Sequence, residues 1–591
     1  MAGNEQDRYK LIAPEAQMEE LSRFEREIIR LEEQRIDPDD FKKFRLENGV
    51  YGIRGVTDEH MIRIKVRFGA LMADQLDSIA DVAEEYATPK VAHITTRQAI
   101  QLHKIRRRHV PTLLKKICEM GLTTREACGN TVRNVTACPF AGISAEEAFD
   151  VKPHADAVSR YFLRNPVCQD LPRKFKIAFE GCPTDHARVP IHDFGAVAQV
   201  RVVEGKPVQG FKTFVGGGLG TTPFSAHLLE EFTLAELLIP TIETVLRLFD
   251  RHGERKNRNM ARIKFLIKKW GIEEFRKQFI QERRYTLMTR SGKASWEIPL
   301  YEEDPPPKPQ GIRAPLPVAS EHYERFCRTN LFPQKQKGYA AVQVRCLLGD
   351  ITVPQMRGVA AIARKFTGGR LRTMIGQNLL LPWVLEEHLY AVYEELSKLG
   401  IATPDAGHLA DITRCPGADT CQIAITHSRG LAVTFGDLFA NGGRPLLDDE
   451  ALKDLTIKIS GCPNSCGQHH IADIGFHGAS SELNGHTVPH YQVMVGGRTA
   501  EGVAEFGQRL GMVPAKRVPE ATKRLLELFR DERNPNERFR DWAQRAGAER
   551  LKKEMDPFRA LPPFSERPDL YEDLGAFGEF KLEMGKGECA S

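Results

Sequence analysis

The sequence predicts a mixed α/β and α+β fold made of two related halves, and a recurring set of landmarks is the main reason. Stretches of similar pattern return about 280 positions later in the chain. The matched pairs are 61–66 with 341–346, 179–183 with 459–463, 211–217 with 491–497 and, at an offset of 277, Cys138-Pro139 with Cys415-Pro416. Strand and helix patterns are mixed within each copy. Several independent landmarks at nearly one offset indicate an internal repeat over about 61–218 and 341–498.

An amphipathic helix precedes the first half. Within 14–35, the apolar side chains at steps of three and four are Met18, Leu21, Phe24, Ile28 and Leu31. This spacing lines one face of a helix. An Asp-Pro pair follows, and a second short helix is expected after it.

The later elements follow from local patterns. Strands are expected at 174–179 and 456–459, and helices at 111–120 and 385–399. Residues 302–317 are rich in proline and acidic residues, which is typical of a semi-rigid linker. We expect 501–550 to be largely helical and 555–591 to form a tail.

Length and composition place the chain among multidomain soluble proteins. At 591 residues it is too long for one core, and a net charge of +5 is only mildly basic. The polar N-terminus has no apolar core of a secretory signal, and no stretch is long enough to span a membrane. We therefore expect a cytoplasmic protein with reduced thiols, no membrane partner and no nucleic-acid partner.

Four cysteines form the tightest chemical motif in the sequence. Cys415 and Cys421 are spaced C-x5-C, and Cys462 and Cys466 are spaced C-x3-C within Gly-Cys-Pro-Asn-Ser-Cys-Gly. Four thiolates are what a cubane iron–sulfur cluster requires. Structural zinc is the alternative, although zinc sites usually use tighter pairs than C-x5-C.

C-x5-C followed by G-C-P-N-x-C-G resembles the sirohaem–[4Fe-4S] site of the assimilatory, ferredoxin-dependent sulfite and nitrite reductases. The resemblance extends over about 40–545. It implies that Cys415, Cys421 and Cys462 hold cluster irons, and that Cys466 holds the fourth and also ligates the sirohaem iron. The fold is then a pseudo-two-fold repeat around a sirohaem–cluster site.

The resemblance also suggests a domain order. A helical arm (1–58) and a first ferredoxin-like half (59–125) precede a first sirohaem-binding domain without cluster ligands (126–330, with the linker). A second ferredoxin-like half (331–405) precedes a second sirohaem-binding domain with the cluster cysteines (406–545) and a tail (546–591).

Four positive side chains match the family residues around the open face of the sirohaem iron. They are Arg63, Arg133, Lys174 and Lys176. Lys174 and Lys176 are two apart on an expected strand and share a face. Like charges side by side repel unless an anion or water lies between them. A solvated strand face is the alternative.

Other residues resemble family contacts to the sirohaem carboxylates. Arg97 lies in the matching segment 94–103, and a guanidinium suits bidentate pairing with carboxylates. Gly216 and Gly217 could expose amides as an anion nest, and Arg498 follows the equivalent glycines of the second half. The basic run 251–269 either binds cofactor or an acidic donor, or is a solvated helix face.

The resemblance implies six-electron reduction of a small oxyanion. Sulfite to sulfide is the first choice and nitrite to ammonia the second. Plant-type nitrite reductases have asparagine at the position of Lys176, whereas sulfite reductases resemble this chain in having lysine. No G-x-G-x-x-G motif opens a βαβ unit, so we expect electrons from ferredoxin or a separate flavoprotein.

Two rival functions and one covalent link stay open on sequence alone. The rivals are a zinc-binding protein that binds nucleic acid and a carrier with the cluster alone. Tyr51 and Cys128 also match the spacing of a thioether found in some ferredoxin-dependent members. An ordinary core tyrosine and an unrelated buried cysteine are the alternative.

Overall fold

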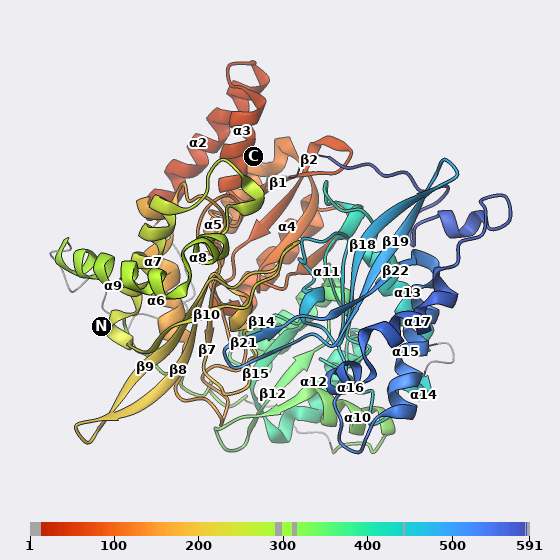
Figure 1. Ribbon diagram of the computed structural model, residues 1–591. Helices are drawn as coiled ribbons and strands as arrows, with labels where there is room; N and C mark the ends of the chain where they lie inside the picture. The colour runs from red at the N-terminus through yellow and green to blue at the C-terminus, as the bar shows by residue number, and fades with distance from the viewer. Residues whose placement is uncertain (1–13, 290–297, 310–315, 441–443, 586, 588–591) are drawn as a thin grey trace.

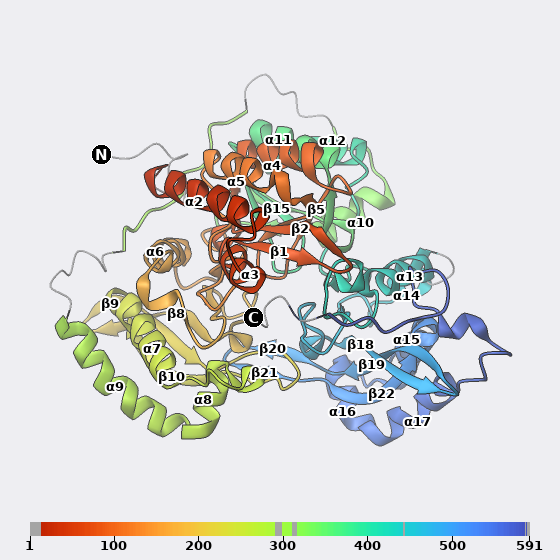
Figure 2. The same cartoon turned by 90° about the horizontal axis from the view of Figure 1, so that it is seen from above.

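Three lobes make up the described part of the chain, which covers residues 14–289, 298–309, 316–440, 444–585 and 587 of a computed structural model. In Figure 2 a central lobe with α4 and α11 lies above two outer lobes. One outer lobe carries β8 to β10 and the other carries β18, β19 and β22, with the hairpin β20–β21 between them (Figures 1 and 2). The mixed α/β and α+β prediction is confirmed.

Two five-stranded sheets form the central lobe, and they exchange one strand each. The first runs β1 (Val50–Ile53), β2 (Val56–Ile64), β5 (Ile100–Arg106), β4 (Val91–Ile94) and β13 (Asp350–Thr352). The second runs β11 (Leu331–Pro333), β12 (Tyr339–Val344), β15 (Leu379–Leu385), β14 (Arg370–Thr373) and β3 (Ala70–Met72). Thus β13 of the second half completes the first sheet, and β3 of the first half completes the second.

Two helices at equivalent positions of the halves follow the exchanged strands β3 and β13. These are α4 (Ala73–Tyr86) and α11 (Val353–Phe366), which lie side by side (Figure 2). Each begins with a glutamine at its third position, and the Gln75 and Gln355 side chains each accept the N–H of the capping residue at 3.0 Å. The remaining helices of the lobe are α2 (Pro14–Glu32), α3 (Pro38–Glu47), α5 (Val110–Glu119), α10 (Glu321–Asn330) and α12 (Leu389–Lys398).

Each outer lobe is a five-stranded sheet covered by helices. The first sheet runs β10 (His227–Leu234), β9 (Lys206–Val215), β8 (Phe194–Val203), β7 (Ile177–Glu180) and β6 (Thr136–Ala137). Its helices are α6 (Lys152–Phe162), α7 (Leu238–His252), α8 (Ile263–Trp270) and α9 (Ile272–Thr289). The second sheet runs β16 (Thr413–Arg414), β17 (Ile457–Ser460), β18 (Ile474–Leu483), β19 (His486–Val495) and β22 (Gln508–Pro514). Its helices are α13 (Ser428–Ala440), α14 (Arg444–Leu447), α15 (Val518–Glu532), α16 (Phe539–Ala546) and α17 (Ala548–Arg559).

The predicted repeat is visible in single hydrogen bonds. Gln98 and Gln377 both adopt positive φ, 54° and 70°. The Gln98 side chain accepts the N–H of Ala137 at 3.0 Å, and the Gln377 side chain accepts the N–H of Arg414 at 2.8 Å. Both amide nitrogens also donate to a carbonyl of the opposite half. These bonds hold each outer lobe against the strand ends of both central sheets.

Several predicted boundaries differ from the structure. The stretch 501–550 is helical only from Val518, because β22 extends the second outer sheet and β20 (Arg498–Ala500) pairs with β21 (Val503–Glu505). Residue 385 ends β15, and the helix expected there begins at Leu389. The strand expected at 174–179 begins at Ile177. In these places tertiary pairing outweighs local pattern. The predicted domain limits stay predictions.

The linker is partly anchored rather than merely a spacer. Glu303 lies 2.7 Å from Lys152 of the first half and 3.2 Å from Arg372 of the second. Burial alone would raise the pKa of Glu303, but these two cations hold it below its ordinary value. A buried carboxylate thus joins the halves. Among the described residues, no helix combines the length and apolarity needed to cross a membrane.

Candidate active site

Two of the cluster cysteines follow neighbouring parallel strands. Cys415 comes directly after β16 and Cys462 comes two residues after β17. These strands pair in parallel, so their carboxyl ends meet at one edge of the sheet. The Gly461 N–H donates to the Cys415 sulfur at 3.2 Å. The second outer lobe therefore brings both cysteine segments together.

Close packing explains the glycines beside these cysteines. A Cβ on Gly461 would lie 2.7 Å from the Thr426 carbonyl oxygen. A Cβ on Gly467 would lie 2.0 Å from the Ile459 carbonyl oxygen. Neither contact is possible for a real side chain, so backbone approach requires glycine at both positions.

The four sulfurs differ in exposure but influence one another. Cys415 and Cys462 are buried, Cys421 is partly buried and Cys466 is exposed. Burial raises the pKa of the Cys462 thiol, and the sulfurs of Cys466, Cys415 and Cys421 raise it further. Four thiolates this close need cations to neutralise them, which suits a cluster of iron ions. The exposed Cys466 is the one suited to reach a second cofactor.

The first half reaches across to this cysteine. The Thr96 hydroxyl donates to the Cys466 carbonyl oxygen at 2.9 Å. Thr96 precedes Arg97 in the loop between β4 and β5. This contact joins the loop that carries Arg97, the predicted cofactor-binding arginine, to the backbone of Cys466 in the other half.

Arg97 has a guanidinium that is only partly matched by acceptors. It donates to the carbonyl oxygens of Asn134 and Ile177 and to the His192 ring, and its Nε is buried without a partner in the described residues. Burial lowers the pKa of Arg97 to about 9, with Arg133 and other cations adding to the effect and Asp193 opposing it. A cofactor carboxylate would supply the missing acceptor.

Arg63 and Arg133 both contact the region around Tyr51 and Cys128, and both donate to the Ala127 carbonyl oxygen. Arg63 donates to the Tyr51 hydroxyl at 2.7 Å and lies 4.6 Å from the centre of its ring. Arg133 donates to the carbonyl oxygens of Ala127 and Gly129 at 3.1 and 2.9 Å, and its Nη2 lies 4.0 Å from the Cys128 sulfur. Backbone and aromatic contacts thus orient both cations.

Lys174 and Lys176 lie on either side of Phe175 in the sequence. Phe175 between them forms an isolated parallel bridge with Val132, although β7 itself begins later. Extended backbone at Phe175 directs its two neighbours to the same side. The shared face predicted for the lysines is therefore consistent with the backbone.

The field around Lys176 is strongly positive. Burial lowers the pKa of Lys176 well below its ordinary value, and Arg97, Arg262 and Lys174 lower it further. The Cys466 sulfur acts in the opposite direction. The mutual repulsion of these cations is unfavourable, and a bound anion would relieve it.

Gly216, Gly217 and Arg498 are expected to offer hydrogen-bond donors to the cofactor. In the structure, Gly216 and Arg498 already donate to groups of the protein. The Gly216 N–H already donates to the Asp193 carbonyl oxygen at 3.0 Å. A Cβ on Gly217 would lie 2.3 Å from the Pro190 carbonyl oxygen, so close packing requires glycine there. Arg498 in β20 donates to the Glu505 carboxylate at 2.6 Å. Their cofactor roles stay predictions.

A buried ion pair was missed by the sequence reasoning. Arg262 donates two hydrogen bonds to the Asp193 carboxylate, at 2.9 and 2.7 Å. The same carboxylate accepts the backbone N–H of Lys176 at 2.9 Å. Arg262 falls in the basic run 251–269, where it and Lys264 are buried while the other lysines and arginines are exposed. The repeat held a signal, because Asp473 stands 280 positions after Asp193.

Models of one protein family match most of the chain. The nitrite and sulphite reductase 4Fe-4S domain matches residues 128–286 and 406–558. The nitrite/sulfite reductase ferredoxin-like half domain matches 53–120 and 332–399. The chain belongs to the nitrite and sulphite reductase family. Members of this family are reductases, so the match does not support the zinc-dependent nucleic-acid-binding alternative.

Relatives of this reductase include proteins named as nitrite reductases and proteins named as sulfite reductases. It is 29% identical to the assimilatory ferredoxin-dependent nitrite reductase of Haloferax mediterranei, over 86% of each chain. It is 30% identical to sulfite reductase [ferredoxin] 1 of Mycolicibacterium paratuberculosis, over 83% of each chain. The solved structure of Mycobacterium tuberculosis NirA protein matches with a TM-score of 0.73 and 28% identity, over 87% of this chain and 92% of that one.

The cofactors of the reductase are sirohaem and a [4Fe-4S] cluster, and the residues present fit both. Three sheltered cysteines and one exposed cysteine suit a cluster that faces a second cofactor. The orphaned Nε of Arg97 and the cations around Lys176 suit a sirohaem with many carboxylates and an anionic substrate.

Proposed function

We propose that this reductase converts sulfite to sulfide with six electrons. The observation that supports it best is the positive field at Lys176, beside the exposed Cys466. Sulfite carries three oxygens and up to two charges, so it gains more from a fourth cation than nitrite does. The lysine at this position also resembles the sulfite reductases.

Each predicted residue has a task that its surroundings support. When bound, the cluster supplies electrons and the sirohaem iron supplies the open coordination position. Arg63 and Arg133, held by backbone and ring contacts, neutralise the substrate without having to reorient. Lys176 Nζ, whose pKa is lowered, gives up a proton more readily than an ordinary lysine.

Nitrite to ammonia is the second candidate. A relative of nearly equal similarity over 86% of its length is named a nitrite reductase. Nitrite is a smaller monoanion, and the same cations would bind it. The choice between the substrates depends on relative rates.

For the electron donor we propose ferredoxin, because the relatives are named as ferredoxin-dependent. A separate flavoprotein is the alternative. We propose that the enzyme lies in the cytoplasm, a reducing compartment in which cysteines stay available to metal.

Steady-state turnover with reduced ferredoxin tests the proposal directly. Sulfite and nitrite are compared at saturation, with sulfide and ammonia measured as products. We expect the larger kcat/KM with sulfite. A much larger value with nitrite would reverse the assignment, and turnover with a flavoprotein but not with ferredoxin would replace the donor.

A further inference from the structure

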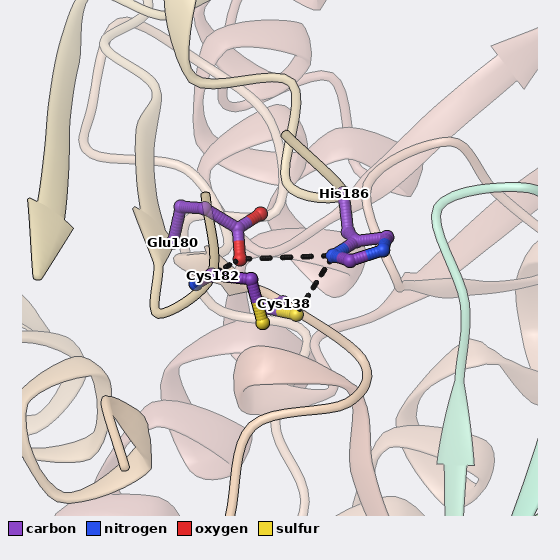
Figure 3. Close-up of side chains that lie close together, drawn as sticks. All are labelled: Cys138, Glu180, Cys182 and His186. Atoms are coloured by element: carbon purple, nitrogen blue, oxygen red, sulfur yellow. Dashed lines mark hydrogen bonds and ion pairs between the residues drawn. The ribbon is translucent and has the colours of Figure 1, made fainter. Parts of the chain in front are cut away.

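A second group of metal-binding side chains lies in the first outer lobe. Cys138, Glu180, Cys182 and His186 point toward one another (Figure 3). Their ligand atoms all lie within 4.8 Å of one another. Both cysteines and the glutamate are buried, while the His186 side chain is 23% exposed. The group is thus sheltered but has an opening to solvent.

The repeat explains how the chain builds this group. Cys138 directly follows β6, and Glu180 ends β7, which pairs with β6 in parallel. Their carboxyl ends meet at one sheet edge, as those of β16 and β17 do around the cluster cysteines. At the repeat offsets, Cys138, Ser144, Cys182 and His186 match Cys415, Cys421, Cys462 and Cys466. Three of the four positions keep a residue that binds metals.

The spacing suits one ion rather than a cubane. With Zn–S of about 2.3 Å and Zn–N of about 2.1 Å, a tetrahedral ion holds sulfur and nitrogen about 3.6 Å apart. The Cys138 sulfur and His186 Nδ1 are 3.5 Å apart. A cubane needs one ligand on each of four irons, whereas Ser144 replaces the fourth cysteine here. Thiolate and imidazole ligands favour zinc among the common divalent ions.

Glu180 holds the loop that carries two of the other three residues, by accepting backbone N–H groups. One carboxylate oxygen accepts the N–H groups of Gly181 and Cys182 at 2.9 and 3.0 Å. The other accepts the Ala187 N–H at 2.7 Å. These bonds fix the turn that carries Cys182 and His186. Glu180 Oε1 also lies 3.9 Å from His186 Nδ1.

We propose that Cys138, Cys182 and His186 bind a single zinc ion, with Glu180 as the carboxylate that orients the site. Binding releases the two thiol protons to solvent, so the ion gains two thiolates and one neutral imidazole. The His186 ring lies 5.0 Å from that of Phe140, which stacks on Phe332 at 4.0 Å. Since Phe332 is in β11, the ion would hold the first outer lobe against the central lobe.

Metal analysis of the holoenzyme tests the proposal. From cells grown with zinc and iron, we expect about one zinc per chain, and X-ray absorption at the zinc edge should show two sulfur ligands and nitrogen. Cys182→Ser and His186→Ala should each lower zinc to about a tenth or less, with iron content and the sirohaem spectrum unchanged. Cys118→Ser, on α5, is the matched control and should keep its zinc.

Other results would overturn the site. These are wild-type enzyme with negligible zinc, equal zinc in Cys182→Ser and wild type, or a zinc edge with only oxygen and nitrogen ligands. A peptide with a Cys138–Cys182 disulfide from freshly purified enzyme would do the same. The absorption measurement uses wild-type enzyme and does not depend on whether any variant folds.

Discussion

The two cysteine-bearing sheet edges share a backbone but differ in chemistry. In the second half, Cys415, Cys421, Cys462 and Cys466 are the predicted ligands of the iron–sulfur cluster. In the first half, the same edge carries two cysteines, a serine and a histidine at these positions. A duplicated scaffold can therefore keep its strand pairing while a few side chains decide which metal it holds.

The same contrast appears at the anion site. The N–H groups of Lys176 and Thr456 each donate to an aspartate, Asp193 or Asp473, at 2.9 Å. The Lys176 side chain enters a field of cations, whereas the Thr456 hydroxyl turns back to Asp473 at 2.8 Å. We expect the second half to hold the iron cofactors and the first half to supply the charge that receives the anion.

Replacing Cys466 should have a much larger effect on cofactor content and activity than replacing the cysteines of the first half. Cys466→Ser should abolish the coupled sirohaem–cluster spectrum and the activity, because a serine oxygen is a poor ligand for soft iron centres. Cys138→Ser and Cys182→Ser in the first half should keep both iron cofactors. Absorption spectra, iron content and turnover measure the effect. Normal turnover and an intact coupled spectrum in Cys466→Ser would contradict the ligand assignment.

Removing the cation from Asp193 in the first half should destabilise the protein more than removing the hydroxyl from Asp473 in the second half. Arg262→Ala leaves Asp193 buried without its cation, which typically costs about 3–5 kcal/mol. Thr456→Val removes only hydrogen bonds to Asp473, at a cost of about 1–3 kcal/mol. Thermal unfolding of both variants should show the larger fall in Tm for Arg262→Ala. Equal shifts would mean that the pair adds nothing beyond ordinary hydrogen bonds.

Neutralising Lys176 should change substrate preference. Lys176→Asn removes one charge from a sheltered anion site, which costs on the order of 2–5 kcal/mol of binding. The loss should weigh more on sulfite than on nitrite. Thr456→Asn, at the equivalent position of the second half, is the control. If Lys176→Asn reduced kcat/KM equally for both substrates, this lysine would belong only to the general positive field.

The smallest expected effect concerns the Tyr51–Cys128 thioether, which stays a prediction beside the alternative of a core tyrosine and an unrelated buried cysteine. Tyr51 and Cys128 belong to one small buried cluster, and the Tyr51 hydroxyl donates to the Ala127 carbonyl oxygen at 3.1 Å. Tryptic peptides joined through these two residues, with two hydrogens lost, would establish the thioether. Separate, unmodified peptides would remove it. Tyr51→Phe should leave the cofactor content unchanged.

The repeat could be predicted because its landmarks return at nearly one offset. The cluster ligands stay a prediction, and they lie in short, distinctive patterns. Cys462 and Cys466 lie in one motif, and Gly461 and Gly467 beside them are fixed by close backbone contacts. The repeat marks Asp193 through Asp473, but it gives no partner for it: 69 positions separate Arg262 from Asp193, and both are ordinary charged residues. The strand β22 was missed because its pairing with β19 outweighs a weak local pattern.

The strand exchange in the central lobe bears on how such a molecule could arise. Each half leaves a sheet edge that only the other half covers, with β13 on β4 and β3 on β14. Unpaired edges invite association, and two identical half-length chains could cover both edges around a two-fold axis. Gene fusion of such a swapped homodimer would free each copy to diverge, one toward electron delivery and the other toward substrate capture.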